Sequence, residues 1–253
     1  MAFSLNVCSS HEDTPDRIII YGEQGVGKTT LAMSFPDAIL LRTEDGAGKL
    51  DLRCDTFPDL LQELEDFDDV IRFLKDSTGR YKTLIIDSLD WLEPVVVRYV
   101  EKKFSDDKKE LKYSGRKSAA DCWRKIFAKL DSVRIQCGLT IVCIAHADST
   151  IVNPPNSEPY SKYTLKLDKL VAPIACEWAD SIYLLALDSR VTTERKVGKA
   201  SGDGSRVIYT SPRPSYIAKS RAKIVDVFHV EKNGDYKEFV EMVLERTNDD
   251  ANS

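Results

Sequence analysis

The sequence lacks long hydrophobic runs and the features of a secretory signal. None of its apolar stretches approaches the ~18 residues of a membrane-spanning helix. Its first residues, MAFSLNVCSSHEDTPD, contain neither a basic region nor an extended apolar core of the kind that signal peptides carry. We therefore expect neither secretion nor a membrane anchor, and we expect the protein to work in the cytoplasm.

Closely spaced cysteines are also missing. The six cysteines are scattered through the 253 residues, without a C-x-x-C pair, and several lie in apolar runs. This pattern favours buried free thiols over a zinc site or a disulfide framework. A chain of this length buries roughly 70–75% of its unfolded surface, so it needs neither disulfides nor a structural metal to fold. The cysteines are Cys8, Cys54, Cys122, Cys137, Cys143 and Cys176.

An overall excess of positive charge is absent as well. The chain carries 36 Lys and Arg against 41 Asp and Glu, a net charge of −5, so nucleic acid would have to bind at a local patch. The charge is unevenly distributed. Residues 42–76 and 231–253 are acidic, whereas residues 102–125 hold nine basic and four acidic side chains and residues 190–223 hold nine and two. Any such patch is expected in one of these two basic segments.

Short apolar runs alternate with helical patterns along most of the chain. The runs are near-continuously apolar, which is typical of a parallel sheet buried on both faces. We expect strands at residues 17–21, 38–42, 82–87, 139–145 and 181–187. Apolar residues at 3.6 spacing predict helices over residues 57–75 and 118–136, the second beginning at Ser118. The sequence therefore predicts an α/β fold with a mainly parallel central sheet and helices on both faces.

The sequence pattern changes after residue 187. Glycines and prolines separate two strand-like runs, 206–210 and 224–230, which predict short antiparallel pieces at one edge of the sheet. Residues 235–245 fit either a helix or the return strand of a hairpin turned at residues 233–234, and we favour the helix. We expect a flexible arm over residues 1–16, a core over residues 17–230, and a C-terminal element with a disordered acidic tail over residues 231–253.

The strongest motif reads GEQGVGKT at residues 22–29 and matches G-x-x-x-x-G-K-[ST]. It follows a predicted strand and enters a helical stretch, the setting in which backbone N–H groups and a helix N-terminus bind phosphate. Lys28 would reach the β- and γ-phosphates, and the Thr29 hydroxyl would ligate Mg²⁺. We therefore predict an Mg-ATP site formed by Gly22, Glu23, Gln24, Gly25, Val26, Gly27, Lys28, Thr29 and Thr30.

Three further strand ends carry polar candidates. Asp87 ends the run 82–87 and is placed to hold a Mg²⁺-bound water. Ser88 follows it, so the carboxylate that activates water must come from elsewhere. The candidate is Glu44, at the end of the second strand, although an ordinary solvated acidic turn is the alternative. His146 ends the fourth strand, where a side chain can sense the γ-phosphate, but a lone histidine there is often without function.

Together these four motifs resemble those of the RecA-core ATPases. The likeness is closest to small phage RecA-core proteins, also classed as AAA-type ATPases and associated with single-strand annealing and recombination, and it spans residues 17–230. The resemblance implies that Glu44 activates the attacking water and that His146 couples nucleotide state to a DNA-binding loop. We find no separate N-terminal polymerisation domain and no large C-terminal domain, which speaks against full strand exchange.

The resemblance also suggests an oligomer. Related ATPases carry a Lys-x-Arg pair that reaches the γ-phosphate of the neighbouring subunit, and Lys219 and Arg221 match it. Two cations offered by a neighbour would stabilise transition-state charge and make hydrolysis depend on assembly into a ring or filament. A solvated basic turn is the alternative interpretation.

Two segments correspond to the DNA-binding loops of RecA-like proteins. Residues 108–117 lie between the metal strand and the sensor strand, and residues 149–166 follow His146. Basic side chains interleaved with tyrosines suit single-stranded DNA, because cations follow the phosphates and rings stack on bases. Charge runs are equally common in plain solvated loops. The candidate DNA contacts are Lys108, Lys109, Lys112, Tyr113, Arg116, Lys117, Tyr160, Lys162 and Tyr163.

The sequence therefore predicts a slow, DNA-stimulated, Mg²⁺-dependent ATPase that forms an oligomer. We expect it to couple ATP binding and hydrolysis to the binding of single-stranded DNA in phage recombination, annealing or replication. A single-strand-binding or replication protein is the expected kind of protein partner. Two alternatives stay open. One is a loader or remodelling ATPase acting on a protein partner, and the other is a nucleotide-gated binding protein with negligible turnover. A small-molecule kinase is less favoured, because we find neither an arginine-rich lid nor an acceptor pocket.

Overall fold

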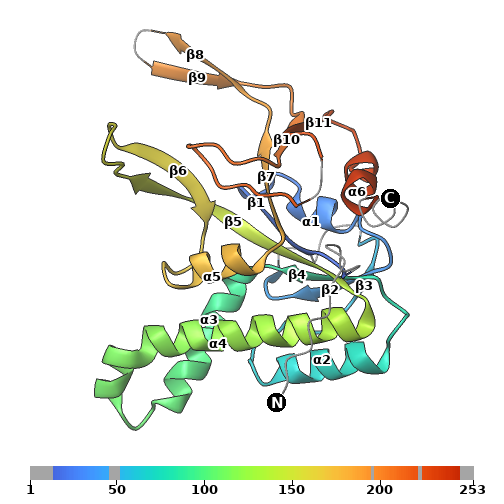
Figure 1. The fold of residues 1–253 in the computed structure, drawn as a ribbon, viewed down its shortest axis with the longest axis vertical. Coiled ribbons are helices and arrows are strands. Elements are labelled where there is room, and N and C mark those ends of the chain that lie inside the picture. Colours follow the sequence, from blue (N-terminus) through green and yellow to red (C-terminus); the bar gives the residue numbers. More distant parts are fainter. Residues whose placement is uncertain (1–13, 46–51, 195–196, 222–223, 246–253) are drawn as a thin grey trace, which may run out of the picture.

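A nine-stranded sheet forms the centre of the protein (Figure 1). The computed structural model describes residues 14–45, 52–194, 197–221 and 224–245. The strands of this sheet are β1 (Arg17–Gly22), β2 (Ala38–Arg42), β3 (Asp55–Thr56), β4 (Thr83–Asp87), β5 (Thr140–Val152), β6 (Tyr160–Leu165), β7 (Ser181–Leu187), β10 (Arg206–Tyr209) and β11 (Val227–Val230). A separate two-stranded ribbon consists of β8 (Arg190–Glu194) and β9 (Val197–Ser201).

The sheet order is β11-β10-β7-β1-β5-β4-β2-β3, and β6 pairs with the far end of β5. Strands β7, β1, β5, β4, β2 and β3 are parallel, whereas β10, β11 and β6 are antiparallel to their neighbours. The predicted mainly parallel sheet with short antiparallel strands near its C-terminal part is therefore confirmed. Strand β1 lies in the middle, between β7 and β5.

Helices cover both faces of this sheet (Figure 1). They are α1 (Lys28–Ala32), α2 (Asp66–Asp76), α3 (Leu89–Lys103), α4 (Lys108–Cys137), α5 (Val171–Trp178) and α6 (Lys237–Leu244). Helices α2 to α5 pack with one face, and α1 and α6 pack with the other. In β1, Ile19 and Tyr21 point to the first face while Ile18 and Ile20 point to the second. Burial on both faces explains why the strands read as continuous apolar runs.

The predicted helix over residues 57–75 is wrong in its first half, because α2 begins only at Asp66. The preceding residues use their backbone groups to extend the sheet instead. The amide of Phe57 donates to the carbonyl of Leu40 at 3.0 Å, and that of Leu61 donates to the carbonyl of Arg42 at 2.9 Å. These bonds to β2 take the place of a first helical turn.

The second predicted helix, over residues 118–136, is too short, because α4 begins at Lys108. The carboxylate of Asp107 accepts a hydrogen bond from the amide of Glu110 at 2.9 Å and so caps the helix eleven residues earlier than Ser118. Helix α3 was not predicted at all. It contains Pro94 in its second turn, which obscures a helical pattern.

The C-terminal part of the chain completes the second core. Strands β10 and β11 confirm the predicted antiparallel pair, and α6 confirms the helix favoured for residues 235–245. Phe239 of α6 lies edge-to-face on Tyr183 of β7, with ring centroids 5.2 Å apart. Helix α6 is thus part of the fold rather than a separate tail. The predicted N-terminal arm lies outside the described residues except for residues 14–16, and the end of the acidic tail lies outside them as well.

The described cysteines Cys54, Cys122, Cys137, Cys143 and Cys176 are all free thiols, and Cys8 lies outside the described residues. Burial raises the pKa of the Cys143 thiol far above its ordinary range. In the described part of the chain, no helix combines the length and the apolar character that crossing a membrane requires.

Candidate nucleotide site

Four neighbouring parallel strands bring the predicted site residues to one edge of the sheet. Gly22 at the end of β1 lies opposite His146 in β5. Arg42 at the end of β2 lies opposite Asp87 at the end of β4, and Glu44 follows two residues later. The carboxyl ends of parallel strands are where ligands bind in open α/β sheets. The structure therefore brings together the candidates from β1, β2, β4 and β5.

The loop between β1 and α1 is shaped by glycines. Gly25 and Gly27 adopt φ values of 76° and 104°, in the left-handed region that other residues avoid. A Cβ atom on Gly22 would lie 2.1 Å from the carbonyl oxygen of Leu185, so the close approach of β7 requires glycine there. This path leads directly into the N-terminus of α1, where free backbone N–H groups can bind an anion.

Lys28 is the first residue of α1 and is only 6% exposed. Its ammonium donates to the carbonyl oxygens of Gly22 at 3.1 Å and Glu23 at 2.9 Å, so it lies inside the loop. Burial lowers the pKa of Lys28, and nearby carboxylates, first that of Asp87, partly offset this effect. The cation is thus held at the position where the phosphates of a nucleotide would bind.

The Thr29 hydroxyl and the Asp87 carboxylate meet directly. Thr29 Oγ1 donates to Asp87 Oδ2 at 2.8 Å, and Asp87 is 4% exposed. Burial raises the pKa of Asp87, and the bond from Thr29 and the charge of Lys28 oppose that shift. A hydroxyl beside a carboxylate is a donor set that suits Mg²⁺. Among the described residues no group of three or more His, Cys, Asp and Glu could hold a metal ion.

Glu44 lies half-buried just beyond β2. The preceding residue fixes this turn, because the amide of Thr43 donates to the carbonyl of Asp87 at 2.8 Å and its hydroxyl donates to the carbonyl of Ser88 at 2.7 Å. Burial raises the pKa of Glu44, and the negative charge of Asp87 adds to this rise, while His146 opposes it. Glu44 therefore lies within electrostatic reach of the site but makes no direct ion pair among the described residues.

His146 is held by an acid that the sequence analysis missed. Its Nδ1 lies 2.8 Å from Asp90 Oδ2, and its backbone amide donates to Asp90 Oδ1 at 3.0 Å. The pKa of Asp90 lies below its ordinary value, because the bonds from His146 outweigh the effect of burial. An ionised carboxylate can only accept, so Nδ1 carries the hydrogen in this contact. The sequence feature that could have identified Asp90 is its place three residues beyond Asp87, in the first turn of α3, where acidic residues are favourable.

Two other residues that the sequence analysis missed support the phosphate-binding loop from behind. Arg206 of β10 donates through Nε to the carbonyl of Val26 at 2.8 Å and through Nη1 to that of Lys232 at 3.2 Å. A Cβ atom on Gly27 would lie 2.9 Å from the hydroxyl of Tyr236. Arg206 and Tyr236 come from the C-terminal part of the chain. No local pattern in the sequence indicated this contact.

Lys219 and Arg221 lie far from these residues, at the opposite edge of the sheet. Lys219 pairs with Ile182 near the start of β7, and its ammonium donates to the carbonyls of Cys176 at 3.0 Å and of Ala179. It therefore closes the C-terminal end of α5. Arg221 forms an ion pair with Asp180 at 2.9 Å. Neither cation can serve the loop of its own chain.

Residues 108–117 were predicted to form a loop, and that prediction is wrong, because they form the first turns of α4. Tyr113 is 78% exposed on this helix. Arg116 is engaged by Asp168, which accepts from Nε at 3.1 Å and from Nη2. The other candidates on this helix, Lys108, Lys109, Lys112 and Lys117, are exposed.

The second candidate segment is a hairpin rather than a loop. Strand β5 continues past the edge of the sheet and pairs with β6, which carries Tyr160, Lys162 and Tyr163 (Figure 1). The Tyr163 hydroxyl lies 3.3 Å from Glu23 Oε1. The negative charge of Glu23 raises the pKa of the Tyr163 hydroxyl. The hairpin therefore contacts the phosphate-binding loop directly.

One of the comparisons with known proteins identifies a family for this chain. No curated protein matches the sequence significantly. Among solved structures, the chain is similar to the RadB recombinase, with 13% sequence identity, a TM-score of 0.45, and coverage of 87% of this chain and 90% of that one. Residues 14–222 match the family described as AAA domain. This match spans well over half of the chain, and the protein therefore belongs to the AAA domain family.

Proposed function

We propose that the protein binds Mg-ATP and hydrolyses it. The observation that carries this proposal is the 2.8 Å contact between Thr29 and Asp87, which joins the phosphate-binding loop to the end of β4 beside the buried Lys28. Phosphate-transferring sites need this combination of a hydroxyl, a carboxylate and a cation around one phosphate position. Membership of the AAA domain family supports the proposal.

In this mechanism Lys28 exchanges its bonds to the carbonyls of Gly22 and Glu23 for the oxygens of the β- and γ-phosphates. Thr29 and Asp87 would hold Mg²⁺, which supplies positive charge against the phosphate oxygens. Glu44 takes a proton from the attacking water, and its raised pKa suits a general base. Nε2 of His146 would contact the γ-phosphate while Asp90 keeps the ring in position.

We also propose that the active form is an oligomer in which Arg221 reaches the nucleotide of a neighbouring subunit. Its position at the opposite edge of the sheet supports a head-to-tail arrangement, because one subunit's loop edge would face the next subunit's Arg221 edge. Arg221 is mostly exposed, so it can leave Asp180. Lys219 would act from the same edge, although its present bonds close α5.

Mixing two inactive variants tests this arrangement. Arg221→Ala and Lys28→Ala should each lose at least about a hundredfold in hydrolysis rate, as expected for loss of a charge at the transferring phosphate. Mixed together they should regain measurable activity, because some interfaces pair an intact loop with an intact Arg221. Arg72→Ala, on the exposed side of α2, is the matched control and should stay active alone. Mixed oligomers without any recovery would exclude a shared site.

We further propose that the β5–β6 hairpin binds single-stranded DNA, as in phage recombination, annealing or replication. Lys162 and two tyrosines supply the cation and the rings that such a ligand requires. The contact between Tyr163 and Glu23, together with the hydrogen bond from the amide of Lys166 to the carbonyl of His146, supports coupling between this hairpin and the nucleotide. The exposed lysines near the start of α4 are further candidate contacts.

DNA stimulation is the test of this proposal. Single-stranded DNA should raise the ATPase rate severalfold, and its binding should weaken steeply with salt because phosphate contacts release counterions. The double variant Tyr160→Ala with Lys162→Ala should lose most of the stimulation but keep the rate without DNA, and Lys75→Ala on α2 serves as the control. An ATPase that DNA neither binds nor stimulates would favour the rival reading, a loader or remodelling enzyme that acts on protein.

A further inference from the structure

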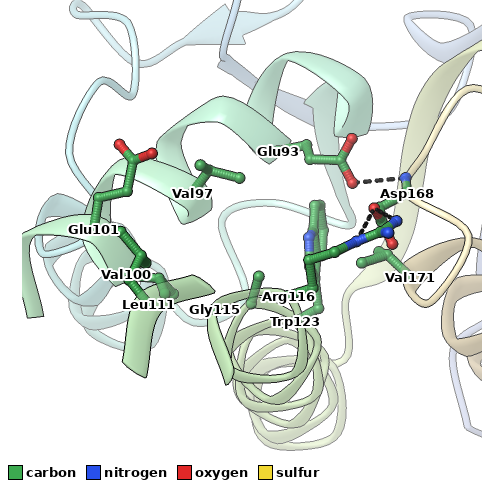
Figure 2. A pocket seen from close by; sticks show the side chains of 11 residues that line it. Glu93, Val97, Val100, Glu101, Leu111, Gly115, Arg116, Trp123, Asp168 and Val171 are labelled. Atoms are coloured by element: carbon green, nitrogen blue, oxygen red, sulfur yellow. Dashed lines mark hydrogen bonds and ion pairs between the residues drawn. The ribbon is translucent and has the colours of Figure 1, made fainter. Parts of the chain in front are cut away.

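A groove of about 320 Å³ lies between α3 and α4, away from the nucleotide site (Figure 2). Its walls are mostly apolar, and Val171 at the start of α5 closes one side. Val97 of α3 is 41% exposed at its rim. This size falls at the lower end of the range of ligand pockets in proteins.

The spacing of small residues explains why the two helices leave this space open. Val97 and Glu101 follow Glu93 by four and eight positions and therefore share one face of α3. On the facing side of α4, Gly115 and Ala119 share one face. A Cβ atom on Gly115 would meet, within 4 Å, only the side chain of Leu111 from its own helix, and no atom of α3. Glycine inside a helix costs about 0.5–1 kcal/mol relative to alanine, so this helix keeps the groove open at some cost.

Two acidic side chains, Glu93 and Glu101, line the α3 side of the groove. Glu93 is half-buried, and one of its oxygens accepts from the backbone amide of Asp168 at 2.8 Å. Burial raises the pKa of Glu93. In the described ranges neither Glu93 nor Glu101 forms an ion pair, whereas Arg116 is already paired with Asp168 (Figure 2). The groove therefore has room for one additional cation.

A buried donor also lacks a partner here. Trp123 lines the groove and is 0% exposed, and its indole Nε1 has no hydrogen-bond partner among the described residues. A buried N–H group left without an acceptor costs about 1–3 kcal/mol. Because Trp123 lines the groove, its indole group can report on what enters it.

We propose that this groove binds an apolar segment of a protein partner that carries one lysine or arginine. The apolar side chains would fill the space beside Val97 and Ala119, and the cation would pair with Glu93. Charge complementarity selects this occupant over nucleic acid, because phosphates would meet two carboxylates. The proposal is independent of ATP hydrolysis.

A synthetic peptide tests the groove directly. The probe is an acetylated, amidated seven-residue peptide of leucines and alanines with one central lysine, and its matched control carries norleucine in place of the lysine. In ¹⁵N-labelled protein the three tryptophans give three indole signals, and Trp123→Phe identifies the one that belongs to Trp123. We expect the lysine peptide to shift this signal and to bind at least about tenfold more tightly than the norleucine peptide.

Two variants locate the binding. Glu93→Gln keeps an oxygen that can accept from Asp168 but removes the charge, so it should weaken the lysine peptide about tenfold and leave the norleucine peptide unchanged. Gly115→Met should fill the groove and abolish binding of both, with melting curves confirming that the helix folds. Glu238→Gln, exposed on α6, is the matched control and should bind like the wild type.

Three results would overturn the proposal. The first is equal binding of the two peptides, or no shift of the Trp123 signal, with the folded wild-type protein. The second is a shift of the Trp123 signal by a single-stranded oligonucleotide instead of the peptide. The third is a shift that depends on protein concentration alone, which would identify a second copy of this chain as the occupant.

Discussion

Replacing Lys28 with alanine is expected to lower the rate of ATP hydrolysis at least about hundredfold. The ammonium is buried at the start of α1, where it makes two hydrogen bonds to the loop that encloses the phosphate position. In a site with little water, a preorganised cation stabilises the charge that develops on the transferring phosphate more strongly than it would in solution. Nucleotide affinity should fall as well, because the same cation meets the phosphates in the ground state.

Single-turnover hydrolysis and nucleotide titration of the purified variant measure both effects. Lys75→Ala, at the exposed end of α2, is the matched control and should hydrolyse ATP like the wild type. Alanine is a good helix former, so α1 should fold normally, and thermal melting checks this. Hydrolysis within a few-fold of the wild-type rate would contradict the assignment of Lys28 and, with it, the proposed site.

Replacing Glu44 with glutamine should lower kcat by a factor on the order of 10² to 10⁴ and leave ATP binding within a few-fold of the wild type. Glutamine has the same shape but cannot take a proton from water. The bonds of Thr43 to the backbone of Asp87 and Ser88 keep the turn in place in either variant. Asp45→Asn, one residue further along and exposed, is the control and should be nearly neutral.

The pH dependence of kcat provides an independent check of Glu44. Burial and the charge of Asp87 raise the pKa of this carboxyl, so its deprotonated, active form is lost at a higher pH than for an ordinary glutamate. The rate should therefore fall as the pH is lowered through this raised pKa, and that acidic limb should be missing from the residual activity of Glu44→Gln. An unchanged rate and pH profile would mean that Glu44 is an ordinary turn residue and that another group activates the water.

Much of the fold and the central site could be predicted because their signals are local. The five buried parallel strands are short apolar runs, and both of their faces are covered, so neighbouring residues along the chain carry the information. The glycines, Lys28 and Thr29 of the phosphate-binding loop are consecutive. Asp87, Glu44 and His146 could be named because parallel strands end at one edge of a sheet.

Helix boundaries could not be predicted, because contacts from elsewhere in the chain decided them. Apolar spacing predicted a helix from residue 57, but hydrogen bonds to β2 hold residues 57 and 61 against the sheet instead. Residues 108–117 were predicted as a loop before the helix that begins at Ser118, yet α4 runs through both from its cap at Asp107. A run of exposed basic residues in a sequence is compatible with either a loop or a helix, so it does not indicate which of the two forms.

By itself, the sequence determined the α/β class, the order of the central strands along the chain, and the loop that holds Lys28. Only the tertiary structure decided that Asp90 holds His146, that Arg206 supports the loop, and that Arg221 lies at the opposite edge. The reason is physical: the features that the sequence determined depend on periodicity and on neighbouring residues. The second depends on contacts between residues 41 to 180 positions apart, which no local pattern records.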